Sequence, residues 1–173
     1  MLMPVRSLIQ LANTHANGLI FIPFGTMTKI QENDARQWLP QQPPFVMIDR
    51  LTEVTDVHTQ SQFFVAADNI FVSDGRLVAE ALIETMAQTC AARLGYLNSL
   101  DGMTEPTIGY IGAVKGYNIM RCPRVGETVT VDVDITGQVF NMFLTQATAR
   151  VGEEVVASAE MKIAVTQDTI KPQ

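Results

Sequence analysis

Apolar residues fill one long segment of this chain almost without interruption. From Leu77 to Ala92 the only charged side chains are Glu80 and Glu84, and no consistent polar face remains. A segment that is apolar nearly all round predicts a buried helix. We expect this helix to run to about Leu97.

Neighbouring residues add detail to the predicted helix. Ser73 or Asp74, at the end of a loop, can cap its N-terminus. Ala87, Ala91 and Gly95 form a ridge of small residues that would allow a sheet to approach closely. The helix is therefore expected to lie against a sheet.

Apolar and polar residues alternate in the C-terminal third. Val129, Val131, Val133 and Ile135 alternate with threonines and aspartates, which is typical of a half-buried strand, and Gly137 is expected to end it. Further strands are expected at Thr107–Lys115, Phe140–Arg150 and Val155–Val165. A glycine-containing hairpin turn joins the last two.

The N-terminal half predicts shorter elements. Asn33 or Asp34 can cap a short helix that Pro40 ends. Phe45–Ile48 predicts a short apolar strand, and residues 52–66 predict a longer one. One long apolar helix with several mostly antiparallel strands predicts an α+β fold in which the sheet wraps around the helix.

Residues 1–26 differ in pattern from the rest of the chain. Their apolar runs are interrupted by polar residues, so neither a signal-peptide core nor a membrane-spanning length forms. We expect an N-terminal extension, a single domain at 27–173, either Met1 or Met27 as initiator, and a cytoplasmic protein.

Composition narrows the function classes. The net charge of −6 and a pI near 4.8 leave no basic stripe for phosphates, so no nucleic-acid partner is expected. Cys90 and Cys122 lack the spacing of a metal or redox motif and predict free thiols in a reducing compartment. With no metal-ligand motif or phosphate loop in the sequence, no metal or nucleotide cofactor is expected.

Three polar residues interrupt the apolar helix at regular spacing. Glu80, Glu84 and Gln88 stand at i, i+4 and i+8 and form one stripe along it. An ionised carboxylate on a buried helix must be paired, hydrogen-bonded, or shifted upward in pKa by desolvation. The stripe predicts a functional site, and a row of satisfied core polar residues is the alternative.

Five motifs, spaced from about Trp38 to Val165, carry a family resemblance. They are Leu39–Arg50, Leu82–Gln88, Tyr110–Lys115, Val125–Glu127 and Gly152–Ala157. In this order they resemble the opening motif, the central-helix motif, the strand after the helix and two later turns of the bacterial 3-hydroxyacyl-[acyl-carrier-protein] dehydratases.

The resemblance implies a hotdog fold and a homodimer whose two sheets join into one. It also implies an acyl tunnel at the dimer interface with a composite site. A His from one subunit acts on the C2 proton of a 3-hydroxyacyl thioester, and a helix Glu from the other serves the leaving hydroxyl. Glu84 matches that Glu. A carboxyl in an apolar pocket stays protonated more readily and can act as a general acid, and Gln88 could orient water.

The catalytic His of the family is missing from this chain. Its position corresponds to Ile70, just before Phe71, and the glycine that opens the family's helix is Ala79 here. The chain has two histidines, His15 in the extension and His58 in a polar stretch. His58 is the candidate for a replacement base.

The resemblance also implies where the substrate would bind. By position these residues are Ile70, Phe71, Ala79, Tyr110 and Gly112. The family takes its substrate on the phosphopantetheine arm of acyl carrier protein, which calls for a basic patch near the tunnel mouth. Candidates for that patch are Arg76, Lys115, Arg121 and Arg124.

Three functions remain open. The first is a dehydratase-like lyase of fatty-acid or polyene-type lipid biosynthesis, which uses a rearranged base or forms a heterodimer with a His-bearing paralogue. The second is an acyl thioesterase in which Glu84 activates water. The third is a non-catalytic subunit that binds acyl chains or acyl carrier protein.

Overall fold

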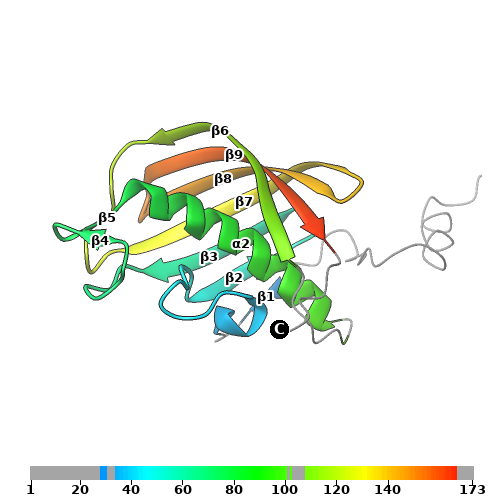
Figure 1. The fold of residues 1–173 in the computed structure, drawn as a ribbon, viewed down its shortest axis with the longest axis horizontal. Coiled ribbons are helices and arrows are strands. Elements are labelled where there is room, and N and C mark those ends of the chain that lie inside the picture. Colours follow the sequence, from blue (N-terminus) through cyan, green and yellow to red (C-terminus); the bar gives the residue numbers. More distant parts are fainter. Residues whose placement is uncertain (1–27, 31–33, 101, 103–107, 167–173) are drawn as a thin grey trace, which may run out of the picture.

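One long helix crosses the concave face of an antiparallel sheet (Figure 1). The computed structural model describes residues 28–30, 34–100, 102 and 108–166, so the predicted extension at 1–26 lies outside the described residues. The helix is α2 (Ala79–Leu100). The sheet has the order β1–β2–β3–β7–β8–β9–β6. This confirms the predicted α+β hotdog architecture.

The strands have the following bounds. They are β1 (Thr28–Lys29), β2 (Arg50–Val54), β3 (His58–Phe64), β6 (Ile108–Ile119), β7 (Thr128–Val139), β8 (Met142–Val151) and β9 (Glu154–Thr166). A separate hairpin of β4 (Val72–Ser73) and β5 (Arg76–Leu77) lies beside the start of α2 in Figure 1. No described helix is long and apolar enough to cross a membrane.

The start of the helix differs from the prediction. Ser73 and Asp74 do not cap α2, because they belong to the β4–β5 hairpin. Asp74 and Gly75 have φ angles of 51° and 71°. Two consecutive left-handed residues, Asp then Gly, are typical of a type I′ turn, the two-residue loop that joins the strands of a β-hairpin. The helix therefore begins at Ala79, two residues later than expected.

Two of the predicted N-terminal strands are also different. Residues 52–66 form two strands rather than one, because Thr55 closes a turn between β2 and β3. Its N–H donates to the His58 carbonyl at 2.8 Å, and its hydroxyl accepts the His58 N–H at 3.0 Å. The segment Phe45–Ile48 joins neither sheet, and side chains of α2 hold its backbone instead.

Bulges lengthen two of the C-terminal strands beyond the prediction. β7 continues past Gly137 because a register shift between Ile135 and Gly137 absorbs the irregularity. β6 runs four residues beyond Lys115, with shifts between Ile111 and Ala113 and between Lys115 and Asn118. It pairs only with β9 among the described residues, so its other side is a free sheet edge.

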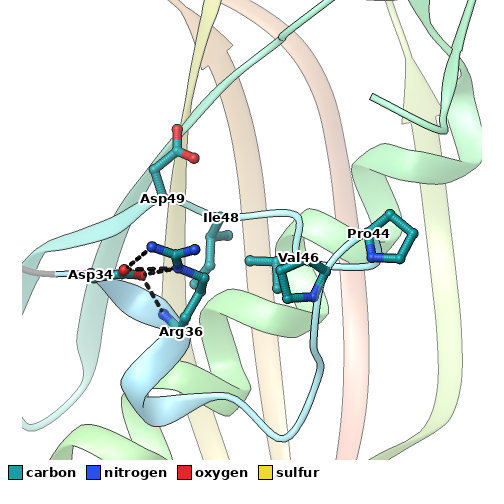
Figure 2. Close-up of a pocket in the computed structure, with 7 residues that line it drawn as sticks. Asp34, Arg36, Pro44, Val46, Ile48 and Asp49 are labelled. Atoms are coloured by element: carbon teal, nitrogen blue, oxygen red, sulfur yellow. Dashed lines mark hydrogen bonds and ion pairs between the residues drawn. The ribbon is translucent and has the colours of Figure 1, made fainter. Parts of the chain in front are cut away.

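The short 3-10 helix η2 (Ala35–Trp38) packs against the C-terminal half of α2. Asp34 caps it as predicted, since its Oδ1 accepts the Arg36 N–H at 3.0 Å, and the two side chains form an ion pair (Figure 2). The Trp38 ring meets Tyr96 edge-on with centroids 5.2 Å apart. A Cβ on Gly95 would lie 2.3 Å from the Trp38 carbonyl oxygen. The absence of a side chain at Gly95 therefore allows η2, and not the sheet, to approach α2 closely.

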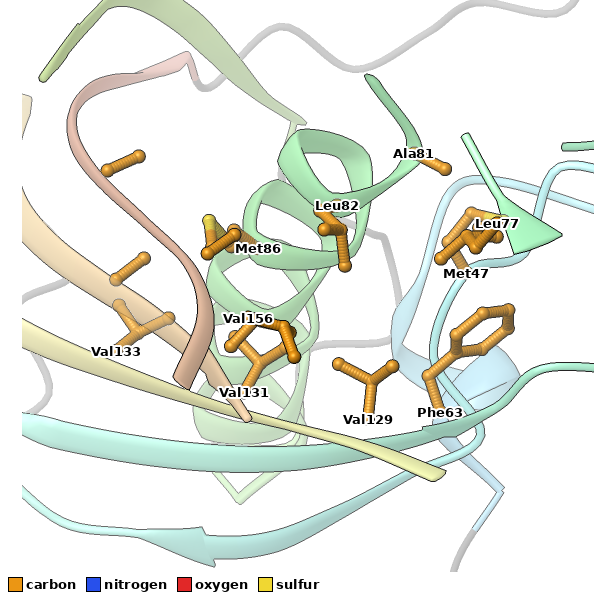
Figure 3. Close-up of a cluster of buried hydrophobic side chains, with 14 of the residues drawn as sticks. Met47, Phe63, Leu77, Ala81, Leu82, Met86, Val129, Val131, Val133 and Val156 are labelled. Atoms are coloured by element: carbon orange, nitrogen blue, oxygen red, sulfur yellow. The ribbon is translucent and has the colours of Figure 1, made fainter. Parts of the chain in front are cut away.

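The core lies between α2 and the inner face of the sheet. Val129, Val131 and Val133 point inward from β7 toward Leu82 and Met86 of the helix, and all five are almost fully buried (Figure 3). Burial of each such side chain contributes about 1.5–3 kcal/mol to folding. This packing fixes the rotation of α2, and with it the face on which Glu84 lies.

Candidate active site

Glu84 and Gln88 are hydrogen-bonded to each other on α2. Gln88 Nε2 donates to Glu84 Oε1 at 2.7 Å and to the Phe45 carbonyl at 2.7 Å. Gln88 Oε1 accepts the Met47 N–H, also at 2.7 Å. Gln88 is fully buried, so its amide joins the helix to segment 45–47 and directs the Glu84 carboxylate. Its described partners are protein groups, whereas the sequence suggested that it orients water.

Glu84 lies on a face of α2 that the described part of the chain leaves partly open. Ile83, Ala87, Ala91 and Leu94 are half-buried on this face. The opposite face is closed by the sheet, where Thr89 Oγ1 lies 2.7 Å from the hydroxyl of Ser61 on β3. The described residues of one chain therefore do not enclose Glu84 in the apolar pocket that the sequence suggested. A second surface is needed to close it.

The loop that carries Ile70 is held close to this site. Asn69 Oδ1 accepts the Phe71 N–H at 2.8 Å, and Asn69 Nδ2 donates to the Met47 sulfur at 3.6 Å. Met47 is bonded through its own N–H to Gln88. Phe71 packs on the core, while Ile70 is 47% exposed. The site therefore joins three segments: the Ile70 loop, residues 45–47 and the helix.

The first turn of α2 is fastened to the same loop. The Val78 N–H donates to the Phe71 carbonyl at 2.9 Å. The carbonyl of Ala79, the first helical residue, accepts the hydroxyl of Tyr117 from β6. Burial raises the pKa of Tyr117 to about 12, so this hydroxyl keeps its proton at neutral pH. Ile70, Phe71 and Ala79 are thus brought together at the N-terminal end of the helix.

Tyr110 and Gly112, also predicted to bind substrate, lie apart from Glu84. Tyr110 pairs with Ala164 of β9, whose neighbour Ile163 points into the core. Directly opposite residues in an antiparallel pair share a face, so Tyr110 faces away from α2. It is 54% exposed, and Gly112 and Lys115 are exposed on the same edge strand. One chain alone does not bring them to Glu84.

His58 does not lie near Glu84 either. It begins β3, where Thr59 and Ser61 are buried under the helix and His58 points to the opposite, convex face. Its Nδ1 lies 2.8 Å from Asp134 Oδ1, and its Nε2 lies 3.6 Å from Asp132 Oδ1. Both ring nitrogens are therefore engaged by carboxylates of β7, away from the helix.

A hollow of about 380 Å³ lies beside segment 43–49 (Figure 2). Its lining residues are Asp34, Arg36, Pro43, Pro44, Val46, Ile48 and Asp49. Met47, between two of them, points into the core instead. The sequence did not predict this hollow, because η2 and an irregular segment form it together. It does not include Glu84.

Two polar residues farther along α2 are buried for structural reasons. Burial raises the pKa of the Cys90 thiol to about 12, so it is unreactive at neutral pH, and both cysteines are free as predicted. The Arg93 guanidinium donates to the carbonyls of Thr55, Asp56 and His58. Arg93 therefore holds the β2–β3 turn, a role that the sequence did not suggest.

The predicted basic residues divide into two groups. Arg121 is bound internally, because Nη1 lies 2.7 Å from Glu127 Oε2 and Nη2 lies 2.9 Å from Glu154 Oε2. The hydrogen bonds that Arg121 donates to Glu154 and Glu127 raise its pKa. Arg76 and Arg124 are exposed, and neither forms an ion pair within the part of the chain that the structure describes.

Among the described residues no group of three or more His, Cys, Asp or Glu side chains could hold a metal ion. Glu84 is bonded to an amide and not to a further carboxylate. Its chemistry is therefore that of a positioned carboxyl group.

Comparison with known proteins gives a consistent result. Residues 33–171 match the family model described as "ApeP-like: ApeP dehydratase". The chain is 24% identical over 144 residues to the 3-hydroxyacyl-[acyl-carrier-protein] dehydratase FabZ of Clostridioides difficile, with 78% of this chain and 96% of that protein covered. It is 26% identical over 152 residues to FabZ of Variovorax paradoxus, with 82% and 98% covered.

A solved structure shares the fold. "The Dehydratase Heterocomplex ApeI:P from Xenorhabdus doucetiae" contains a chain that superposes with a TM-score of 0.73 at 17% sequence identity. The superposition covers 80% of this chain and 94% of that one. The fold and the order of its elements are therefore shared over most of both chains.

Proposed function

Because this chain belongs to the ApeP-like dehydratase family, we propose that it is one subunit of a dehydratase acting on 3-hydroxyacyl thioesters carried by acyl carrier protein. The observation that carries the proposal is the Glu84 carboxylate, held at 2.7 Å by a fully buried Gln88 on a partly open face of the helix. We infer that this oriented carboxyl is one half of a composite site that a second subunit completes.

The reaction divides between two groups. A base removes the C2 proton of the substrate, the C3–oxygen bond breaks, and the hydroxyl leaves as water after it accepts a proton from a carboxyl. The products are a 2-enoyl thioester and water. Glu84 is suited to the second task, because Gln88 Nε2 occupies one carboxyl oxygen and leaves the other for the leaving group.

The base is then expected from another subunit. The resemblance implies that Ile70 stands at the loop position of the dehydratase His, and His58 faces the other side of the sheet. A heterodimer with a His-bearing paralogue would combine that partner's His with Glu84. The reciprocal site would contain Ile70 and be inactive, so the heterodimer would have one working site. The solved dehydratase heterocomplex of the same fold is a precedent for such an assembly.

The free edge of β6 is a suitable place for the partner. Ile111, Val114 and Ile119 on this edge strand are between 37% and 41% exposed. Unpaired N–H and C=O groups of an edge strand can pair with a strand of another chain. Joining the two sheets there would cover these side chains and bring a second surface over the open face of α2.

The test compares this chain alone with the same chain co-purified with a His-bearing hotdog paralogue from the same genome. A general base contributes about a hundredfold to ten-thousandfold in rate, so the isolated chain should form enoyl thioester more slowly by about that factor. In the complex, Glu84→Gln in this chain should abolish turnover. A complex that is unaffected by Glu84→Gln would instead make this chain a binding subunit. Release of free thiol would indicate a thioesterase.

A further inference from the structure

A row of apolar residues crosses one end of the convex face of the sheet. Val139 of β7 is opposite Met142 of β8, and Met142 is opposite Ala164 of β9. Ala164 is also opposite Tyr110 of β6. Directly opposite residues share a face, and Ile163, the neighbour of Ala164, is buried in the core. The apolar row therefore faces away from α2, with Val139 57% exposed.

Phe140 adds an aromatic ring to this row at the tip of the β7–β8 hairpin. The tip projects at the end of the sheet that is far from the β4–β5 hairpin (Figure 1). Phe140 is 93% exposed and has a φ angle of 54°. A two-residue hairpin loop whose first residue alone is left-handed favours glycine there. A large apolar ring at this strained position gains no burial from the described part of the chain, which indicates a contact surface.

The neighbouring part of the convex face is polar. His58 Nδ1 lies 2.8 Å from Asp134 Oδ1, and Gln60 Nε2 donates to Asp132 Oδ1 at 2.9 Å. Lys162, two residues before Ala164, is exposed. An exposed apolar patch bordered by polar residues is typical of an interaction site. Any such contact is therefore confined to the apolar row and the hairpin tip.

The chain enters the sheet near this row. Thr28, Val54, Thr59 and Val133 lie in register across β1, β2, β3 and β7. β1 runs away from the hairpin tip, so the residues before Thr28 leave toward it. Val139 lies six residues beyond Val133 and three strand spacings from β1. These spacings place Val139 about 24 Å from Thr28.

The chain before Thr28 is long enough to reach the row. Residues 1–27 lie outside the described residues, and the family match begins only at residue 33. An extended chain spans at most about 3.3–3.6 Å per residue, so Leu19 and Ile20 can reach about 26–32 Å from Thr28. Ile22 and Phe24 reach at most about 22 and 14 Å, which falls short.

We propose that segment 8–20 of this same chain covers the apolar row. Leu19 and Ile20 lie against Val139 and Met142, and the apolar residues at 8–12 extend toward Tyr110. The segment is tethered through β1, so its effective concentration at the row is on the order of millimolar. This tether favours the segment over a second copy of the chain as the occupant.

The test is hydroxyl-radical labelling of the full chain, read by peptide mass spectrometry at Phe140 and Met142. Leu19→Ser/Ile20→Ser should raise the labelling of both residues by about threefold or more, because the row loses its cover. Met120, 56% exposed just after the other end of β6, is the internal reference and should not change.

The matched control is Ile22→Ser/Phe24→Ser. It removes two apolar side chains from the same part of the sequence at positions that fall short of the row, so labelling of Phe140 should stay at the parental rate. Equal labelling in the two double variants, or no increase in Leu19→Ser/Ile20→Ser, would overturn the proposal.

Two other occupants give different results in the parent chain. Protection of Phe140 that is lost on dilution would assign the row to a second copy, and protection that appears only with phospholipid vesicles would assign it to a membrane surface. Either result contradicts the proposal, which requires protection independent of concentration and of lipid.

A cross-link provides a second measurement. Cys90 is buried, so Cys122→Ser leaves no accessible native thiol among the described residues. In that background Ile20→Cys/Val139→Cys should form a disulfide within one chain, whereas Phe24→Cys/Val139→Cys should not. Absence of the disulfide from both variants, or its formation in both to the same extent, would count against the proposed path of the segment.

Discussion

The backbone N–H of Met47 is bonded to the side-chain oxygen of Gln88, forty-one residues away in sequence, at 2.7 Å. Through this bond, the irregular segment before β2 and the helix behave as one unit. The Gln88 amide also orients Glu84. A change in Gln88 should therefore affect both stability and catalysis.

Replacing Gln88 tests this coupling. Gln88→Leu leaves the buried Met47 N–H without an acceptor, which costs about 1–3 kcal/mol. We expect the free energy of unfolding, measured by urea titration, to fall by that amount. Gln42→Leu, at an exposed position on the adjacent segment, is the control and should change little. Equal stability of the two variants would contradict a structural role for the amide.

Substitution of Gly95 should reverse the usual effect of alanine in a helix. Gly→Ala normally stabilises a helix interior by about 1 kcal/mol. Here the new Cβ would meet the Trp38 backbone at 2.3 Å, so we expect a net loss of about 1–3 kcal/mol in thermal or urea unfolding. Gly109→Ala is a graded comparison, because its nearest neighbour is the Ile163 methyl group at 3.3 Å. A stabilised Gly95→Ala variant would show that η2 does not pack closely here.

The Glu127–Arg121 pair should make stability depend on pH in one direction. Hydrogen bonds from Arg121 hold the pKa of Glu127 below its usual range. A lowered folded-state pKa stabilises the fold above the unfolded pKa, and this contribution is lost as pH falls through the folded value. Glu127→Gln should therefore cost about 0.5–1 kcal/mol at pH 7, and the difference should begin to shrink as pH falls below the ordinary glutamate pKa of about 4.3 and vanish only below the lowered folded pKa.

Urea titrations at several pH values measure this difference. Glu153→Gln, in the exposed turn after β8, is the matched control and should show no such trend. A Glu127→Gln effect that stays constant from pH 7 to pH 3 would mean that the carboxylate charge is not what stabilises the turn.

Restoring a base at position 70 should increase the activity of the isolated chain. Ile70 is 47% exposed on a loop held by Asn69, so a His side chain fits without displacing the core. We expect Ile70→His to raise enoyl formation by up to about a hundredfold. Ile70→Asn is polar but cannot act as a base and should give no increase. Equal rates for both variants would mean that Ile70 does not occupy the position of the base.

Local sequence patterns predicted the main elements of the fold and misplaced several boundaries. The apolar run at residues 77–92 and the alternating valines of β7 were sufficient for the central helix and a wrapped sheet. The β4–β5 hairpin was missed, although Asp74-Gly75 is a strong turn signal, because its strands have two residues each. Tertiary contacts, not periodicity, stabilise such short strands.

The candidate site was only partly predictable for a related reason. The spacing of Glu84 and Gln88 places both on one helix face, which the structure confirms. The partners of Gln88 in segment 45–47 lie more than forty residues away and are backbone groups. No side-chain pattern marks such partners in a single sequence. The role of Arg93, whose partners are also mostly backbone carbonyls, was hidden for the same reason.

The exposed edge of β6 has a consequence for how this protein is made in a cell. A twelve-residue strand that presents unpaired backbone and side chains such as Tyr110, Ile111 and Val114 is a template for misassociation until another chain covers it. Under the proposed assembly, newly synthesised copies in excess of the proposed partner are expected to aggregate or be degraded. The yield of soluble protein would then follow the supply of the partner, and balanced co-expression of both chains should raise it.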